Sequence, residues 1–138
     1  MYLGCFVEEF EVRGLKMKKK IIIVEDDPKD QKLFKLLMER FPNTETKYSS
    51  NGDEALELIK KEKPNLAILD IHLPGKSGLE ICKEIKESED LKDILTLAIS
   101  AFDMENYKKV LSDAGFDKFI GKPLRIQEFI KVVRQLLS

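Results

Sequence analysis

From Lys19 onward the chain alternates between two kinds of segment, and this alternation allows few folds. Short runs of mostly apolar residues are typical of strands buried on both faces of a sheet. Between them, apolar residues recur with the spacing of amphipathic helices. Strands that alternate with helices in this way form a parallel sheet with helices on both faces, an α/β fold. The apolar runs are residues 19–24, 66–69, 94–100 and 118–121.

Five helices and a fifth strand complete this pattern. Residues 44–50 alternate only weakly and are polar, which predicts a strand at the edge of the sheet. Residues 52–61 and 77–88 predict two helices. The other three are predicted by apolar residues with helical spacing: Leu33, Leu37 and Phe41 after Pro28; Tyr107, Val110, Leu111 and Ala114; and Ile126, Phe129, Ile130 and Val133.

Length and composition suit one soluble domain. The 138 residues are 43% hydrophobic, which is ordinary for a globular protein. With 24 basic and 25 acidic residues, the net charge of -1 gives no reason to expect direct nucleic-acid binding. No apolar run approaches the ~20 residues of a membrane helix, so no membrane insertion is expected. Cys5 and Cys82 form no C-x-x-C pair and indicate reduced thiols in a cytoplasmic protein.

Residues 1–18 stand outside the alternation. Phe6, Val7 and Phe10 are compatible with one face of a helical turn, and the segment is also compatible with an extra strand. A simpler interpretation is that Met17 is the true start, because "MKKKIIIVEDD" opens a domain naturally. The expected division is an N-terminal extension of uncertain role over 1–18 and a single domain over 19–138.

Polar residues collect where the predicted strands end. Glu25 and Asp26 follow the first strand, Asp70 ends the third, Ser100 ends the fourth, and Lys122 follows the fifth. The carboxyl ends of parallel strands meet at one edge of the sheet, where ligands of open α/β folds bind. We therefore expect several carboxylates, a hydroxyl and an ammonium in one cleft.

This set of groups favours metal-assisted phosphoryl transfer. Clustered carboxylates repel one another, and Mg²⁺ removes the repulsion because it prefers oxygen ligands. An aspartate can accept a phosphoryl group as an acyl phosphate. A metal and a lysine then offset the charge of the transferring group, while a hydroxyl donates to its oxygens. Asp27 stands apart, because an acid before Pro28 is typical of a helix N-cap.

Five motifs together resemble the receiver domain of two-component response regulators. They are "IIIVEDDP", "NGDEALELI", "LAILDIHLPGKSGLEICKEIK", "LAISAF" and "DKFIGKPL", in the order and spacing of that family. The resemblance covers Lys19 to Ser138. It implies a doubly wound, flavodoxin-like sheet of five parallel strands in the order 2-1-3-4-5.

The resemblance also implies a role for each strand-end residue. Asp70 would be the phosphoacceptor, and Lys122 would pair with it and later with its phosphoryl group. Asp26, Asp70 and the backbone carbonyl of His72 would bind Mg²⁺, which Glu25 would contact through water.

Further expectations concern the switch and the loops. Ser100 would hydrogen-bond the phosphoryl group, and Phe119 would occupy the aromatic switch position without the hydroxyl of the family's frequent tyrosine. Pro123 would follow a cis peptide bond. Gly75 and Gly78 would permit the tight loop after the phosphoacceptor.

Two side chains would flank the water that hydrolyses the acyl phosphate. Phe102 would obstruct this water and lengthen the phosphorylated lifetime. His72 is interpreted as a residue at the rim of the site, since relay histidines usually stand on helical bundles.

The function implied is that of a signalling phosphoacceptor, not of an enzyme with a separate substrate. A sensor histidine kinase would donate the phosphoryl group to Asp70, and the receiver would pass the signal to another protein. Alternatives are a phosphorelay intermediate that hands the group to a second histidine, and a receiver-like scaffold that is never phosphorylated. A haloacid-dehalogenase-type phosphatase would need an acid where this chain has His72.

Overall fold

The computed structural model describes residues 18–101 and 104–138 of the chain. The expectations for the extension before Lys18, including Cys5, and for Phe102 lie outside the described residues. Within these two ranges, no helix combines the length and the apolar character that crossing a bilayer requires.

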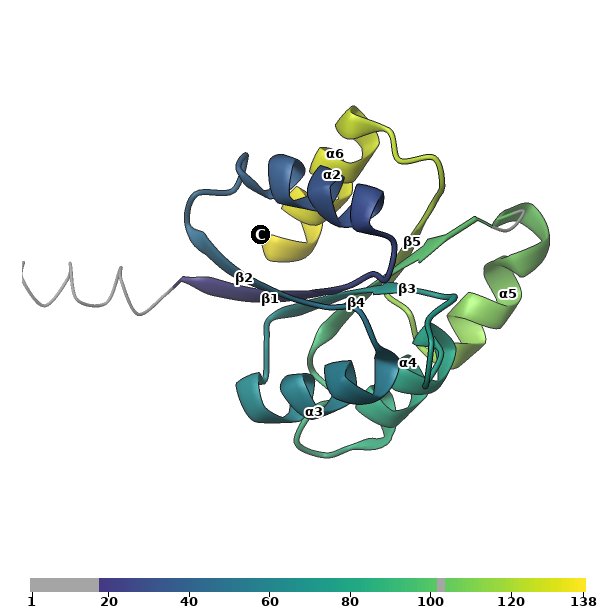
Figure 1. The fold of residues 1–138 in the computed structure, drawn as a ribbon. Coiled ribbons are helices and arrows are strands. Elements are labelled where there is room, and N and C mark those ends of the chain that lie inside the picture. Colours follow the sequence, from purple (N-terminus) through teal and green to yellow (C-terminus); the bar gives the residue numbers. More distant parts are fainter. Residues whose placement is uncertain (1–17, 102–103) are drawn as a thin grey trace, which may run out of the picture.

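Five parallel strands form one sheet in the order β2-β1-β3-β4-β5 (Figure 1). Because β1 pairs with both β2 and β3, the strand order reverses at β1. The predicted order is therefore confirmed. The strands are β1 (Lys19–Val24), β2 (Thr44–Ser49), β3 (Leu66–Asp70), β4 (Leu95–Ser100) and β5 (Lys118–Gly121).

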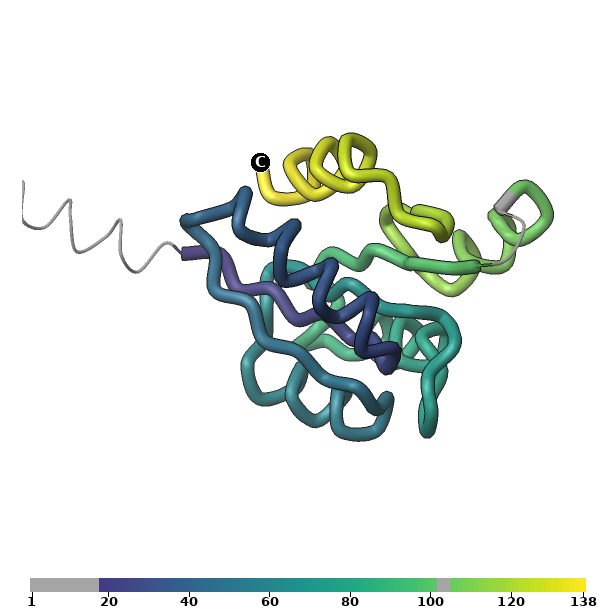
Figure 2. The backbone as a smooth tube through the Cα atoms, turned by 45° about the horizontal axis from the view of Figure 1, so that its top comes forward, coloured from purple at the N-terminus to yellow at the C-terminus, as the bar shows by residue number. Residues whose placement is uncertain are grey.

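The helices cover both faces of the sheet. In Figure 1, α2 and α6 lie on one face and α3, α4 and α5 on the other. The tube in Figure 2 also shows α2 and α6 side by side. The five predicted helices are confirmed as α2 (Pro28–Met38), α3 (Gly52–Glu62), α4 (Gly78–Glu87), α5 (Met104–Ala114) and α6 (Ile126–Leu137).

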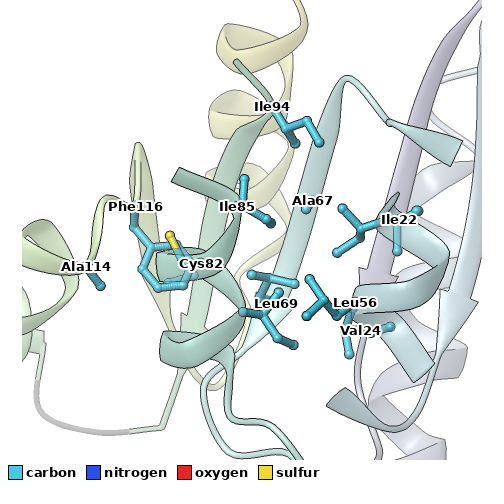
Figure 3. Close-up of a cluster of buried hydrophobic side chains, with 14 of the residues drawn as sticks. Ile22, Val24, Leu56, Ala67, Leu69, Cys82, Ile85, Ile94, Ala114 and Phe116 are labelled. Atoms are coloured by element: carbon cyan, nitrogen blue, oxygen red, sulfur yellow. The ribbon is translucent and has the colours of Figure 1, made fainter. Parts of the chain in front are cut away.

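The sheet separates two hydrophobic cores, which explains the continuous apolar runs. Along β1, Ile21 and Ile23 contribute to the core under α2 and α6, whereas Ile22 and Val24 contribute to the opposite core. All four are buried, so a polar residue at any of these positions would face a core. Figure 3 shows the second core, where side chains from the strands meet those of α3 and α4.

The polar strand predicted at the edge is confirmed. Within residues 18–101 and 104–138, β2 pairs with β1 alone, and its residues are half-buried or exposed. Two apolar residues of the helical patterns are exposed instead. Val110 is 43% exposed and Ile126 is 48% exposed. Val110 lies just before the buried Leu111, and Ile126 is the first residue of α6, so both lie at the margin of an apolar stripe.

Candidate functional site

Three carboxylates meet at the carboxyl ends of β1 and β3. Glu25 and Asp26 directly follow β1, and Asp70 is the last residue of β3. One ligand oxygen from each lies within 4.8 Å of the other two. Glu25 and Asp70 are buried, whereas Asp26 is exposed. This arrangement places negative charges close together with one side open to solvent.

The ammonium group of Lys122 lies among these acids. Its Nζ atom is 2.8 Å from Asp70 Oδ2, 2.9 Å from Asp30 Oδ2 and 3.1 Å from Glu25 Oε1. Burial by itself would lower the pKa of Lys122, but the hydrogen bonds to Asp70 and Asp30 outweigh it and hold that pKa above its usual value. Lys122 therefore stays charged throughout the neutral range.

Both oxygens of Asp70 accept hydrogen bonds. Oδ2 accepts from Lys122, and Oδ1 accepts from the backbone N–H of His72 at 2.8 Å. The loop after β3 then turns back with Gly75 at φ 77°, a left-handed conformation that favours glycine. A Cβ on Gly78 would lie 2.4 Å from the carbonyl oxygen of Asp70, so the start of α4 can approach β3 only without a side chain there.

Glu25 is the acid of this group whose ionised form burial disfavours. Its Oε2 accepts the backbone N–H of Asp27 at 3.0 Å. Its Oε1 forms an ion pair with the Lys122 ammonium at 3.1 Å but makes no well-directed hydrogen bond within the described part of the chain. Burial raises the pKa of Glu25 to about 7, and the neighbouring Asp70 adds to the rise.

These carboxylates suit a hard divalent cation. A buried oxygen that makes no well-directed hydrogen bond, a raised carboxyl pKa and three acids within reach of one point are what such an ion would satisfy. Carboxylate oxygens with one open side also match Mg²⁺, which keeps several waters. The residues present therefore fit the predicted metal.

The structure brings the fourth and fifth strand ends to the same edge. Ser100 is buried at the end of β4, and its carbonyl accepts the backbone N–H of Lys122 at 2.8 Å. Phe119 in β5 is half-buried against the core under α3, α4 and α5. The peptide bond between Lys122 and Pro123 is cis, as expected.

Comparison with known proteins decides the family. The sequence profile of the response regulator receiver domain matches residues 21–134. The chain belongs to the response-regulator receiver family. It is a signalling protein domain, in agreement with the resemblance of its motifs.

Individual relatives agree with this assignment. The polar-differentiation response regulator DivK of Brucella anthropi is 36% identical over 122 residues, which cover 88% of this chain and 98% of DivK. A putative response regulator from Chloroflexus aurantiacus has a TM-score of 0.79 at 28% identity, covering 86% of this chain and 97% of that one. The BeF₃-activated receiver domain of Klebsiella pneumoniae RstA has a TM-score of 0.77 at 27% identity, covering 86% and 98%.

One residue of this receiver's site was missed by sequence reasoning. Asp30 lies in the first turn of α2, and its carboxylate contacts Lys122 directly. The sequence did contain a signal for Asp30. The helix after the first strand begins at the carboxyl end of that strand, so its first turn lies at the edge of the sheet where the site forms. The predicted role of Asp27 is confirmed: it is the N-cap of α2, and its Oδ1 accepts the N–H of Lys29 at 2.9 Å.

Proposed function

We propose that Asp70 accepts a phosphoryl group from the phosphohistidine of a sensor histidine kinase. The observation that carries this proposal is the pairing of Asp70 with Lys122 at 2.8 Å, beside Glu25 and Asp26. A carboxylate oxygen of Asp70 would form a bond to phosphorus while the bond between phosphorus and the histidine nitrogen breaks. The histidine leaves with the electron pair of that bond, and the product is an acyl phosphate.

A magnesium ion would assist this transfer. Asp26, Asp70 and the backbone carbonyl of His72 would hold it, and Glu25 would contact it through water. When bound, Mg²⁺ offsets negative charge on the transferring group. Lys122 offsets part of the same charge, because its ammonium already touches the accepting carboxylate.

Phosphorylation would then bias a two-state equilibrium. Ser100 and Lys122 would bind the phosphoryl oxygens, the loops after β4 and β5 would rearrange, and Phe119 would turn inward. Phe119 must act by packing, since it has no hydroxyl to donate. The changed surface would be that of α5, β5 and α6, and a protein partner would bind it.

The receiver would also influence the lifetime of its own acyl phosphate by autodephosphorylation. Water attacks the phosphorus in that reaction, the bond between phosphorus and the Asp70 oxygen breaks, and inorganic phosphate leaves with the free carboxylate of Asp70 restored. Because the phosphoryl donor is a kinase that consumes ATP, the protein would act in the cytoplasm.

Phosphorylation by a small donor tests the proposal. The protein would be incubated with acetyl phosphate and Mg²⁺ and followed by intact mass. We expect one added phosphoryl group in the wild type and none in Asp70→Asn, with unfolding curves showing that the variant remains folded. Asp113→Asn is the matched control, because it changes an exposed acid outside the site and should retain the adduct.

The same experiment separates the alternatives. A wild-type protein that never gains mass would be a receiver-like scaffold, and the proposal would be wrong. An adduct that persists in Asp70→Asn would place the phosphoryl group on another residue. Transfer of the group from phosphorylated Asp70 to a second histidine protein would identify a phosphorelay intermediate.

A further inference from the structure

Asp30 gives the Lys122 ammonium a partner outside the cluster of Glu25, Asp26 and Asp70. The distances from Nζ to Asp30 Oδ2 and to Asp70 Oδ2 are almost equal, 2.9 and 2.8 Å. Both are short, charge-assisted hydrogen bonds. Asp30 is only partly exposed, with 28% of its side chain accessible, so solvent screens this contact incompletely.

Phosphorylation would affect the contacts of Lys122 with Asp30 and with Asp70 differently. The phosphoryl group would be attached to Asp70, so Lys122 would keep a partner on that residue. Asp30 belongs to α2, and its carboxylate would then face an additional anion across the same ammonium. A contact that is stronger in one state than in the other shifts the equilibrium toward the first state.

We propose that Asp30 is a positioning residue that stabilises the unphosphorylated arrangement by holding the Lys122 ammonium in competition with the phosphoryl group. This inference rests on the proposed function of Asp70. Asp30 thereby lowers the affinity of the site for an anion. It also shifts the two-state equilibrium toward the unphosphorylated arrangement. Replacing its carboxylate with an amide would release the ammonium toward Asp70 and remove one repulsive charge.

The test uses beryllofluoride, which binds an aspartyl carboxylate as an anionic phosphoryl mimic. Its affinity would be measured by titration at fixed, saturating Mg²⁺ for the wild type, Asp30→Asn and Asp27→Asn. Asp27→Asn is the matched control. It removes an acid from the same end of α2, and asparagine is an equally good N-cap. Mg²⁺ affinity, unfolding curves and the rate of phosphorylation by acetyl phosphate are measured for the same proteins.

We expect Asp30→Asn to bind beryllofluoride roughly threefold to tenfold more tightly than the wild type and to be phosphorylated faster. Asp27→Asn should differ from the wild type by less than about twofold. A purely structural role for Asp30 would lower stability without this gain in anion affinity.

Three results would overturn the inference: unchanged affinity in Asp30→Asn, weaker binding in Asp30→Asn, or an equal gain in Asp27→Asn, which would reflect net charge alone. If the wild type itself neither binds beryllofluoride nor gains a phosphoryl group, the proposed function fails first. The two failures are therefore distinguishable.

Discussion

At the scale of single residues, the site combines burial with charge repulsion, and both disfavour the ionised form of Glu25. Its carboxylate is 1% exposed, and its Oε1 makes an ion pair with Lys122 but no well-directed hydrogen bond among residues 18–101 and 104–138. The single ammonium of Lys122 is shared with Asp30 and Asp70. A site with more acids than cations is poorly stabilised without a metal and well prepared to bind one.

Replacement of Glu25 by glutamine should stabilise the metal-free protein in a pH-dependent way. The folded-state pKa of about 7 lies above the ordinary value of 4.5, so the folded protein binds this proton more tightly than the unfolded chain does. The protonated carboxyl therefore contributes stability that is fully present below about pH 4.5 and is lost as the pH rises through about 7. Glutamine resembles the protonated form at every pH.

We expect Glu25→Gln to raise the free energy of unfolding by about 1–3 kcal/mol at pH 8 and to change it little at pH 4.5. Urea unfolding in EDTA at both pH values measures this difference. Glu89→Gln, at a glutamate whose side chain is 89% exposed, should stay within about 0.5 kcal/mol of the wild type. A destabilised Glu25→Gln at pH 8 would show that ionised Glu25 is favourable in the folded state.

At the scale of secondary-structure elements, a polar cluster joins β4 and α4 to the residue before β5. Asp117 Oδ2 accepts the backbone N–H of Thr96 at 2.8 Å, the Thr96 hydroxyl at 3.1 Å and Lys86 Nζ at 3.1 Å. Lys86 also donates to the carbonyl of Ile94 at 2.8 Å. Because Thr96 is fully buried, its polar groups depend mainly on this one carboxylate.

Asp117→Ala should therefore cost stability, because the amide and hydroxyl of Thr96 would lose their main acceptor. We expect the free energy of unfolding to fall by about 1–3 kcal/mol, the cost of leaving buried polar groups unsatisfied. Chemical denaturation measures it. Asp113→Ala is the matched control, since Asp113 forms an exposed i,i+4 pair with Lys109. Equal effects of the two variants would mean that the cluster around Thr96 adds no stability.

At the scale of the whole molecule, the site ties together strands that are distant in sequence. β1 and β3 supply the carboxylates, and Lys122 follows β5 at the opposite edge of the sheet from β2. A ligand bound at this point contacts loops from across the sheet, so its binding energy stabilises the complete fold and not one helix.

Magnesium should accordingly raise the unfolding temperature, and EDTA should lower it again. At ten times the Kd the gain is about 1.4 kcal/mol, or roughly 4 °C for a chain of this size. Differential scanning calorimetry with and without Mg²⁺ tests this. Asp26→Asn should lose most of the shift, because it removes one of the proposed ligands. If added Mg²⁺ leaves the unfolding temperature of the wild type unchanged, the proposed metal site is contradicted.

Much of this architecture could be predicted from the residues alone. Continuous apolar runs identified β1, β3, β4 and β5. In β3 every side chain is buried, as in a strand covered on both faces. β5 is instead an edge strand of the described sheet, with Lys118 exposed and Phe119 half-buried. The polar residues 44–50 identified the edge strand for the opposite reason. Periodicity could not predict the strand order, because it says nothing about which strands are neighbours. That order was implied by the resemblance to the receiver family.

The sequence by itself determined which chemical groups stand at the strand ends, because their place after each strand is a local property of the chain. Only the tertiary structure decided how they meet. Lys122 contacts Asp70 across 52 residues and Asp30 across 92, and such contacts depend on how helices and loops pack around the sheet. The same packing left Val110 and Ile126 exposed and gave Thr96 its partner Asp117. Local patterns specify elements, whereas the distances that produce chemistry arise only when those elements are assembled.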